Sequence, residues 1–181
     1  MKRWMTISCL TLALLLVCGA SWADTGSSQF NEGTEPDGFR GIKWGTDLAT
    51  VPGMTMVGKT RVSSVYQKAD DELKLGDATL TKILYYAYDG KFYEARLFMK
   101  EGEANWEALK KEEAKNWQAL RAAMQERYGP GYEVGGGMFY YNGKETGISI
   151  RYPKSEKAWA ISVYSEALAR EARDAEKKAR Q

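Results

Sequence analysis

The overall architecture follows from residues 80–99, which run Leu80-Thr-Lys-Ile-Leu-Tyr-Tyr-Ala-Tyr-Asp-Gly-Lys-Phe-Tyr-Glu-Ala-Arg-Leu-Phe-Met99. Asp89-Gly90 stands between two runs that are rich in aromatic and aliphatic residues. Asp-Gly in this setting favours a two-residue hairpin turn in which both turn residues take a positive φ. The turn fixes the register, so Tyr86 is expected opposite Tyr93 and Leu80 opposite Met99.

This register predicts a hairpin with two different faces. One face is apolar and is expected to meet the core; it carries the pairs Leu80 with Met99, Lys82 with Leu97, Leu84 with Ala95, and Tyr86 with Tyr93. The other face is mixed, and its candidate binding residues are Ile83, Tyr85, Phe92, Arg96 and Phe98. Tyr and Arg are favoured at recognition surfaces. Core filling is the alternative explanation for so many aromatic residues, and the C-terminal helix is an alternative cover for this face.

A long helix is predicted after this hairpin, over residues 103–128. Its apolar positions recur at helical spacing and are Trp106, Leu109, Trp117, Leu120, Met124 and Tyr128. Gly129-Pro130 is expected to end it, because glycine commonly follows the last helical residue and proline cannot continue a helix.

A second hairpin is predicted at Asn142-Gly143. Its core face is expected to carry Phe139, Tyr141, Thr146, Ile148, Ile150 and Tyr152. A last strand turns Trp159, Ile161 and Val163 inward, and Ser165 then opens a charged helix over residues 166–181, with Leu168, Ala172, Ala175 and Ala179 as its apolar positions. The predicted fold class is α+β: a mainly antiparallel sheet of hairpins packed by one long helix, with a short C-terminal helix.

The N-terminal residues have the pattern of a cleaved export signal. Lys2 and Arg3 precede an apolar run over residues 10–17, and residues 21–23 supply the small side chains that signal peptidase recognises. Cleavage is expected before Asp24, which predicts a periplasmic or secreted protein with no membrane span after cleavage. An uncleaved anchor and lipidation at Cys18 are the alternatives.

Three further segments are predicted downstream of residues 1–23. Residues 24–38 contain one large apolar side chain, Phe30, and are expected to form a flexible leader. Residues 39–165 are expected to form a single α+β domain, in which Thr46 caps a short helical turn. Residues 166–181 form the charged C-terminal helix described above.

The composition narrows the function classes. The chain has 26 basic and 24 acidic residues, and loss of Lys2 and Arg3 would leave 24 of each. This balance argues against a nucleic-acid partner, because binding to phosphates needs a surplus of Lys and Arg. The sequence has no histidine, and both cysteines, Cys9 and Cys18, lie in the signal. We therefore expect no metal, no cofactor and no assignable catalytic residue.

One motif matches a nucleotide-binding loop letter for letter. Residues 53–60, Gly53-Met-Thr-Met-Val-Gly58-Lys59-Thr60, fit the pattern G-x-x-x-x-G-K-[ST]. A phosphate-binding loop lies between a buried strand and the N-terminus of a helix. Here Pro52 precedes the motif and a β-prone run follows it. The surrounding sequence instead predicts strands over residues 54–67.

Acidic residues leave two further possibilities open. Asp70-Asp71-Glu72 and Glu112-Glu113 are short acidic runs without a calcium-loop pattern, so a loop or a solvated helix face is the better interpretation. Glycoside hydrolysis needs two carboxyl groups that face one bond. Glu94, Glu145 and Asp89 lie on or near predicted strands, but spacing alone does not show whether two of them converge.

The opening of the predicted domain carries a resemblance. Residues 39–46, Phe39-Arg-Gly-Ile-Lys-Trp-Gly-Thr46, resemble the start of small exported proteins of Gram-negative bacteria that have no known activity. Those proteins share the later order of a Tyr-rich hairpin, a Trp-containing helix ending in Tyr-Gly-Pro, and a second hairpin. The resemblance covers about residues 39–165. It implies a periplasmic location and no catalytic residue.

These patterns together predict a non-catalytic periplasmic binding or interaction module. Its partner is an unknown protein or envelope component, and its oligomeric state is not defined by the sequence. Two alternatives remain: a hydrolase of the cell envelope that uses carboxylates, and an envelope-structural or stress protein. Whether the chain is an enzyme therefore stays open, with binding as the favoured function.

Overall fold

The structure confirms the predicted α+β class. The computed structural model describes residues 29–101, 113–134, 138–151 and 158–181. Its centre is an antiparallel sheet of eight strands, accompanied by helices α1 (Glu113–Tyr128) and α2 (Glu166–Lys178). Neither helix in these ranges is both long enough and apolar enough to cross a membrane.

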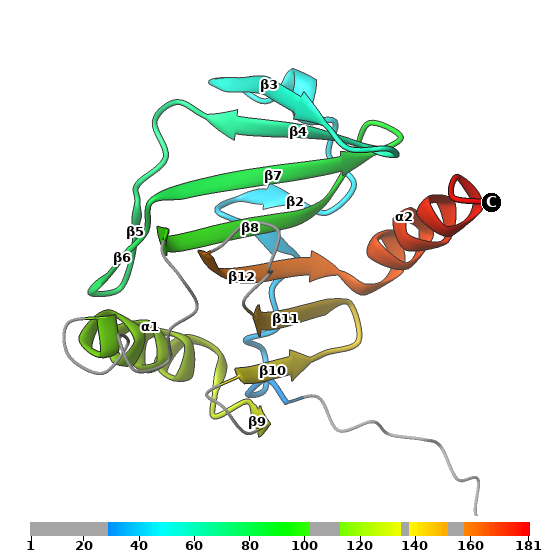
Figure 1. Ribbon diagram of the computed structural model, residues 1–181. Coiled ribbons are helices and arrows are strands. Elements are labelled where there is room, and N and C mark those ends of the chain that lie inside the picture. The colour runs from blue at the N-terminus through cyan, green and yellow to red at the C-terminus, as the bar shows by residue number, and fades with distance from the viewer. Residues whose placement is uncertain (1–28, 102–112, 135–137, 152–157) are drawn as a thin grey trace, which may run out of the picture.

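The eight strands follow one another across the sheet from β3 at one edge to β9 at the other (Figure 1). In spatial order they are β3 (Met54–Lys59), β4 (Ser63–Lys68), β7 (Lys82–Tyr88), β8 (Lys91–Glu101), β12 (Ala158–Ser165), β11 (Thr146–Arg151), β10 (Met138–Asn142) and β9 (Tyr132–Val134). The last long strand, β12, lies between β8 and β11 and so joins the two hairpins.

Short elements flank this sheet. The pair β1 (Gly38–Phe39) and β2 (Ile42–Lys43) precedes the short 3-10 helix η1 (Leu48–Thr50). The pair β5 (Lys74–Leu75) and β6 (Ala78–Thr79) connects β4 to β7 and contacts α1.

The β7–β8 turn forms as predicted, but its register shifts beyond the turn. Asp89 and Gly90 have φ values of 50° and 75°, and Ala87 pairs with Phe92. Tyr86 then pairs with Glu94, so β8 contains one extra residue, Tyr93. Such a β-bulge turns two consecutive side chains toward the same side of the sheet. The predicted pairing of Tyr86 with Tyr93, and the pairs beyond it, are therefore wrong by one residue.

The bulge changes which residues meet the main core. Ile83, Tyr85 and Phe92, which were expected on the mixed face, are buried in the main core together with Ala95 and Leu97. Tyr86 and Tyr93, which were expected to meet that core, pack in a smaller cluster on the opposite face under α2. The sheet is thus covered on both faces.

The second hairpin and its core face are confirmed, but its turn lies two residues later than predicted. Asn142 belongs to β10 and pairs with Gly147, and the Gly143 N–H donates to the Thr146 carbonyl at 2.9 Å, so residues 144–145 form the turn. Strands β10 and β11 pair with Tyr141 opposite Ile148. Five of the predicted core residues are buried: Phe139, Tyr141, Thr146, Ile148 and Ile150. The sixth, Tyr152, lies outside the described residues. On β12, Ile161 and Val163 are buried as predicted, and the side chain of Trp159 is not described.

Helix α1 packs one apolar side into the main core. Leu120, Met124 and Tyr128 are buried and Trp117 is partly buried against the same cluster. The helix ends at Tyr128, and Gly129 follows with a φ of 102°, as the sequence predicted. The first part of the predicted helix, up to residue 112, lies outside the described residues.

The N-terminal segment differs from the predicted leader. Phe30 is buried against the rings of Tyr128 and Tyr141, at centroid distances of 5.8 and 5.4 Å. The Glu35 carboxylate accepts hydrogen bonds from the backbone N–H groups of Glu145 and Thr146 at 2.6 and 2.8 Å. Residues 29–38 are therefore attached to the domain. One aromatic side chain and one carboxylate provide these contacts, which the polar composition of the segment did not suggest.

Residues 39–46 anchor the chain to both hairpins. The Trp44 indole N–H donates to Thr146 Oγ1 at 2.8 Å, and its ring lies 4.9 Å from that of Phe92. The following 3-10 helix is capped by Asp47, whose side chain accepts from the Ala49 N–H, so the predicted cap at Thr46 is wrong by one residue.

The nucleotide-loop motif lies on a strand, as its surroundings predicted. Residues 54–59 form β3 at the edge of the sheet, where Met56 and Val57 are 51 % and 53 % exposed. Thr60 lies in the turn to β4, where its Oγ1 accepts from the Ser63 N–H at 2.9 Å. A strand in place of a helix leaves this segment without the anion-binding geometry of a phosphate loop.

Helix α2 begins directly after Ser165, as the sequence predicted. The Ser165 side chain accepts from the Leu168 N–H, and its acidic first turn and basic last turn complement the helix dipole. Ala169 and Ala172 are buried against Tyr86 and Tyr93. The predicted apolar positions Ala175 and Ala179 are instead half-buried and exposed.

Buried tyrosines predict a loss of stability at alkaline pH. Tyr141 is fully buried, its hydroxyl donates to the Gly129 carbonyl at 2.8 Å, and burial raises its pKa to about 12. Between pH 10 and pH 12 the unfolded chain loses this proton while the folded chain keeps it. The free energy of unfolding should therefore fall by about 1.4 kcal/mol per pH unit for this tyrosine alone.

Urea unfolding at a series of alkaline pH values measures this effect. Tyr141→Phe should lose about 1 kcal/mol at neutral pH with the hydrogen bond, but its stability should then fall less steeply above pH 10. Tyr132→Phe, at a side chain that is 57 % exposed, is the matched control and should follow the parent curve. Equal slopes for the parent and Tyr141→Phe would contradict the assignment.

Candidate functional site

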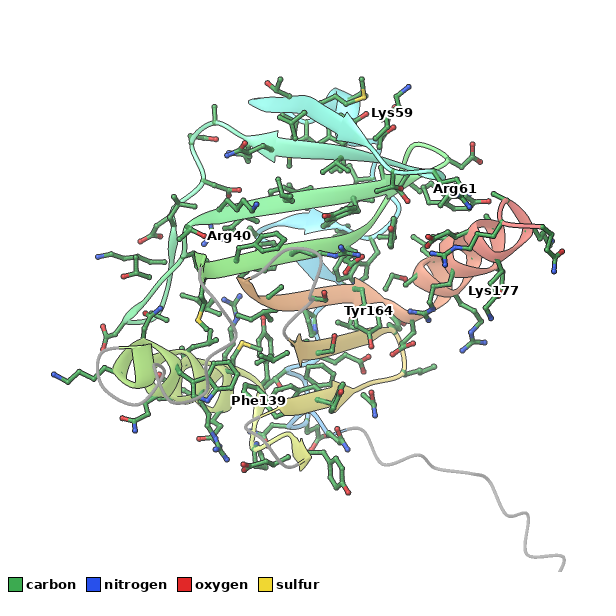
Figure 2. All side chains as sticks on the ribbon, viewed as in Figure 1. Arg40, Lys59, Arg61, Phe139, Tyr164 and Lys177 are labelled. Atoms are coloured by element: carbon green, nitrogen blue, oxygen red, sulfur yellow. The ribbon has the colours of Figure 1, made fainter. Side chains whose placement is uncertain are left out.

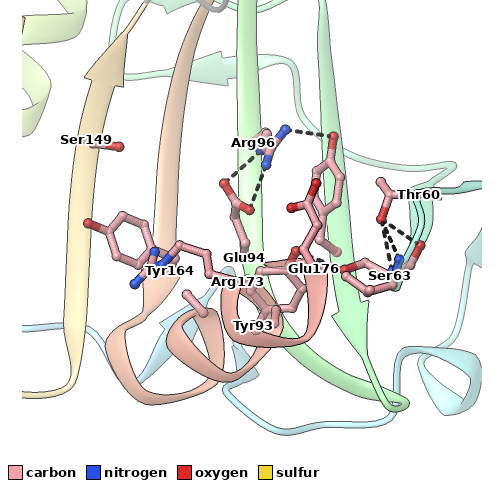
Figure 3. A pocket seen from close by; sticks show the side chains of 13 residues that line it. Thr60, Ser63, Tyr93, Glu94, Arg96, Ser149, Tyr164, Arg173 and Glu176 are labelled. Atoms are coloured by element: carbon pink, nitrogen blue, oxygen red, sulfur yellow. Dashed lines mark hydrogen bonds and ion pairs between the residues drawn. The ribbon is translucent and has the colours of Figure 1, made fainter. Parts of the chain in front are cut away.

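A cleft lies between α2 and the face of the sheet opposite the main core. Its volume is about 390 Å³. The sheet contributes mostly hydroxyl-bearing and charged side chains, principally Ser63, Tyr86, Tyr93, Glu94, Arg96 and Tyr164 (Figure 3). Helix α2 contributes Ala169, Ala172, Arg173 and Glu176. Figure 2 shows Tyr164 and Arg61 at the end of the sheet from which α2 projects. We call this site the α2 cleft.

A bidentate ion pair forms one wall of the α2 cleft. Arg96 Nε donates to Glu94 Oε1 at 2.7 Å, and Arg96 Nη2 donates to Glu94 Oε2 at 3.0 Å. The Glu94 side chain is 8 % exposed and that of Arg96 is 24 % exposed. The bulge positions this pair, because it turns Tyr93 and Glu94 to the same face, and Arg96 lies two residues further along the strand.

The Arg96 guanidinium also lies over an aromatic ring. Its Cζ is 4.3 Å from the centroid of the Tyr86 ring, and Nη1 lies 3.5 Å from the Tyr86 hydroxyl. Burial alone would lower the pKa of Arg96, but the hydrogen bonds and charge of Glu94 outweigh it and raise this pKa. The Arg96 guanidinium therefore stays positively charged, and Glu94 and the Tyr86 ring hold it in position.

Tyr93 forms the inner end of the cleft beside the β3–β4 turn. Its hydroxyl is hydrogen bonded to Ser63 Oγ at 3.1 Å. Burial, and then the charge of Glu94, raise the pKa of Tyr93. The tyrosine therefore stays neutral at physiological pH.

Helix α2 leaves space because its inward residues are small. Ala169 and Ala172 face the sheet, and Arg173 reaches from the helix toward Tyr164 (Figure 3). Glu176 pairs with Arg180 at 2.6 Å, which lowers its pKa. The end of the helix is held by Arg61, which donates to the Ala179 carbonyl at 3.3 Å.

Tyr164 and Ser149 complete the far side of the cleft. Tyr164 lies across β11 because residue 147 is glycine: a Cβ there would come within 2.5 Å of the Tyr164 ring. Ser149 lines the cleft and pairs in register with Ser162, which in turn pairs with Arg96. Ser162 Oγ is buried and makes no hydrogen bond with any of the described residues.

The five binding residues predicted from the sequence do not share one surface. Ile83, Tyr85 and Phe92 are buried in the main core. Phe98 is buried on the opposite face beside Ala160, with Lys82 Nζ 4.5 Å from its ring centroid. Arg96 alone lines the α2 cleft. The prediction that these five residues share one face was wrong, because the bulge shifts the pairing of β7 with β8 by one residue.

Sequence reasoning missed most residues of the cleft. Tyr93 and Glu94 were placed on opposite faces by the uninterrupted register, and Tyr164, Arg173 and Glu176 were not singled out. The one available signal was the pattern of small residues on the C-terminal helix, which implied a close approach to some partner surface.

Another polar cluster stabilises the fold from the main core. The Tyr85 hydroxyl donates to Asp71 Oδ1 at 2.9 Å, and Arg40 Nη1 donates to the same atom at 3.0 Å. Burial, followed by the charge of Asp71, raises the pKa of Tyr85. Residues 70–72 form a loop as predicted, but the Asp71 side chain is buried and not solvated.

The carboxylates considered for hydrolysis are dispersed. Asp89 lies in the β7–β8 turn, and Glu145 lies between β10 and β11, where its N–H bonds to Glu35. Glu94 lines the α2 cleft, where the second carboxylate is Glu176. Among the described residues no three Asp, Glu, His or Cys side chains gather as a metal site would require.

Comparisons with known proteins do not assign the chain to a family. No protein-family model, curated protein or solved structure matches the chain. The functional argument therefore depends on the α2 cleft itself.

Proposed function

We propose that the protein is a non-catalytic binding module whose ligand enters the α2 cleft. The observation that carries this proposal is the composition of the cleft: a bidentate Glu94–Arg96 pair, three tyrosines and a second arginine line about 390 Å³ of space. Small-molecule sites are typically concavities of roughly 300–1,000 Å³ with a few positioned polar groups.

The chemistry of the cleft favours binding over hydrolysis. Glu94 accepts two hydrogen bonds from Arg96, one on each carboxylate oxygen, so it acts as the partner of a fixed cation. A glycosidase also needs one carboxyl group with a raised pKa to act as the acid. The pKa of Glu176 is lowered by Arg180 instead. Glu176 therefore does not have the environment of a general acid.

The cellular setting follows from the N-terminal pattern. Residues 1–23 have the charge, apolar run and cleavage site of an export signal. We therefore place the binding module in the periplasm or outside the cell, with a component of the envelope as its ligand. Lipidation at Cys18 would keep the same compartment.

Saturation-transfer NMR with a defined ligand panel tests the proposal. The panel contains neutral disaccharides, sugar phosphates and zwitterionic dipeptides. Ala172→Phe fills the cleft from α2, and Ala167→Phe places the same side chain on the exposed side of that helix. We expect at least one class to bind the parent and Ala167→Phe, and binding to fall by more than tenfold in Ala172→Phe.

Two results would overturn the proposal. In the first, no class binds the parent protein while deletion of the protein still weakens the envelope, which supports the structural alternative. In the second, binding is equal in Ala172→Phe and Ala167→Phe, which places the site elsewhere. Turnover of a bound saccharide that is lost in Glu94→Gln would instead support the hydrolase.

A further inference from the structure

We infer that the ligand of the α2 cleft is a short neutral saccharide. This inference rests on the proposed function, because it names the chemical class that the same cleft takes. It follows from the charge balance of the lining, from the kind of hydrogen-bonding groups there, and from the aromatic surfaces.

The charge balance argues against an ionic ligand. Two guanidinium groups, of Arg96 and Arg173, and two carboxylates, of Glu94 and Glu176, line the cleft, and three of these four charges are held in ion pairs. Glu94 and Arg96 are neutralised by each other at 2.7 Å, and Glu176 is paired with Arg180. An anion or a zwitterion would have to compete with these ion pairs, whereas a neutral ligand leaves them in place.

The hydrogen-bonding groups suit hydroxyl groups of a ligand. A hydroxyl both donates and accepts, so it can bridge a carboxylate acceptor and a guanidinium donor. The cleft offers both kinds next to each other, together with hydroxyls of Ser63, Ser149 and Thr60. An apolar ligand would remove solvent from these polar groups without replacing its hydrogen bonds, which is costly in a confined space.

An aromatic ring supplies the complementary apolar surface. Tyr86 and Tyr93 line the cleft but are only 5 % and 7 % exposed, and the Arg96 guanidinium lies over the Tyr86 ring. The accessible ring is that of the half-buried Tyr164, which the Gly147 backbone allows to lie across β11. A sugar ring has an apolar C–H face and a polar hydroxyl rim, which match an aromatic surface bordered by charged groups. The volume of about 390 Å³ limits the ligand to a short saccharide.

Binding of cellobiose, maltose and di-N-acetylchitobiose, measured by NMR titration, tests this inference. At least one disaccharide should bind with a dissociation constant that does not change as salt is raised, because a neutral ligand is not screened. Arg173→Gln removes exposed guanidinium donors and should weaken binding about tenfold. Arg170→Gln, an exposed arginine of α2 outside the cleft, is the matched control and should leave binding unchanged.

The outcomes separate this inference from the proposed function. If glucose 6-phosphate or a dipeptide binds, is lost in Ala172→Phe and weakens with salt, while no disaccharide binds, the saccharide class is wrong and the binding site remains. If neither disaccharides nor charged probes depend on Ala172, both the inference and the proposed function fail. Equal affinity in Arg173→Gln and Arg170→Gln would remove Arg173 from the site and overturn the recognition scheme.

Discussion

Phe92→Ala is expected to lower the free energy of unfolding by about 3–5 kcal/mol, the range for truncating a fully buried phenylalanine. Phe92 is 0 % exposed and packs against the rings of Trp44 and Tyr85 at centroid distances of 4.9 and 5.7 Å. Its backbone also exchanges two hydrogen bonds of 2.8 Å with residues 45 and 46. Truncation therefore leaves a cavity where the N-terminal segment joins β8.

Equilibrium unfolding in urea, followed by tryptophan fluorescence, measures this loss. Phe92→Leu should cost much less, because it retains most of the buried volume. Tyr132→Ala removes an aromatic side chain that is 57 % exposed and should change stability by less than about 0.5 kcal/mol. If Phe92→Ala were as stable as Tyr132→Ala, Phe92 would belong to a surface, as the uninterrupted register had suggested.

The same residue shows what the sequence could and could not predict. Asp89-Gly90 specifies its turn through local backbone preferences, so the turn and the adjacent pair Ala87–Phe92 were predictable. The bulge at Tyr93 has no local signature, because Tyr and Glu are both acceptable on either face of a strand covered on both sides. The one-residue shift means that no single register gives both strands the right face: Ala95 and Leu97 of β8 meet the main core as predicted, whereas Ile83 and Tyr85 of β7 meet it contrary to the prediction.

The core face of the second hairpin was predictable, because the change in turn position left the same residues on that face. The apolar residues of β11 alternate with small or polar ones, and Tyr141 and Ile148 share a face for any turn length that keeps the parity of the register. Packing of the C-terminal helix on the hairpin was predicted only as an alternative, because its alanines contribute little hydrophobic area. The α2 cleft depends on the bulge, because the bulge brings Glu94 onto the face that carries Tyr86 and Tyr93.

The segment before residue 39 shows a further limit of composition. Residues 24–38 are mostly polar, which is typical of a flexible leader. Folding depends on individual side chains, however, and Phe30 fills a space between Tyr128 and Tyr141. Those two residues are distant from Phe30 in sequence, so no local pattern could reveal the contact.

Glu94→Ala should produce the second large loss of stability, about 3 kcal/mol, because it leaves the Arg96 charge largely buried without the carboxylate that pairs with it. The value lies at the low end for buried pairs, since the Arg96 side chain keeps 24 % of its exposure. Glu94→Gln retains an acceptor oxygen and should cost about 1–2 kcal/mol. Urea unfolding of both variants, with Glu126→Ala on the exposed side of α1 as the control, measures the difference.

The double variant Glu94→Leu with Arg96→Met separates folding from function. A buried ion pair is often replaced by apolar residues of similar volume without loss of stability, so the double variant should recover to within about 1 kcal/mol of the parent. Strictly additive losses in the two single variants and the double variant would show that the pair is not coupled. If the double variant is as stable as the parent, folding does not require charges at these two positions. A double variant that folds but no longer binds the disaccharide would then assign the Glu94–Arg96 pair to recognition in the α2 cleft.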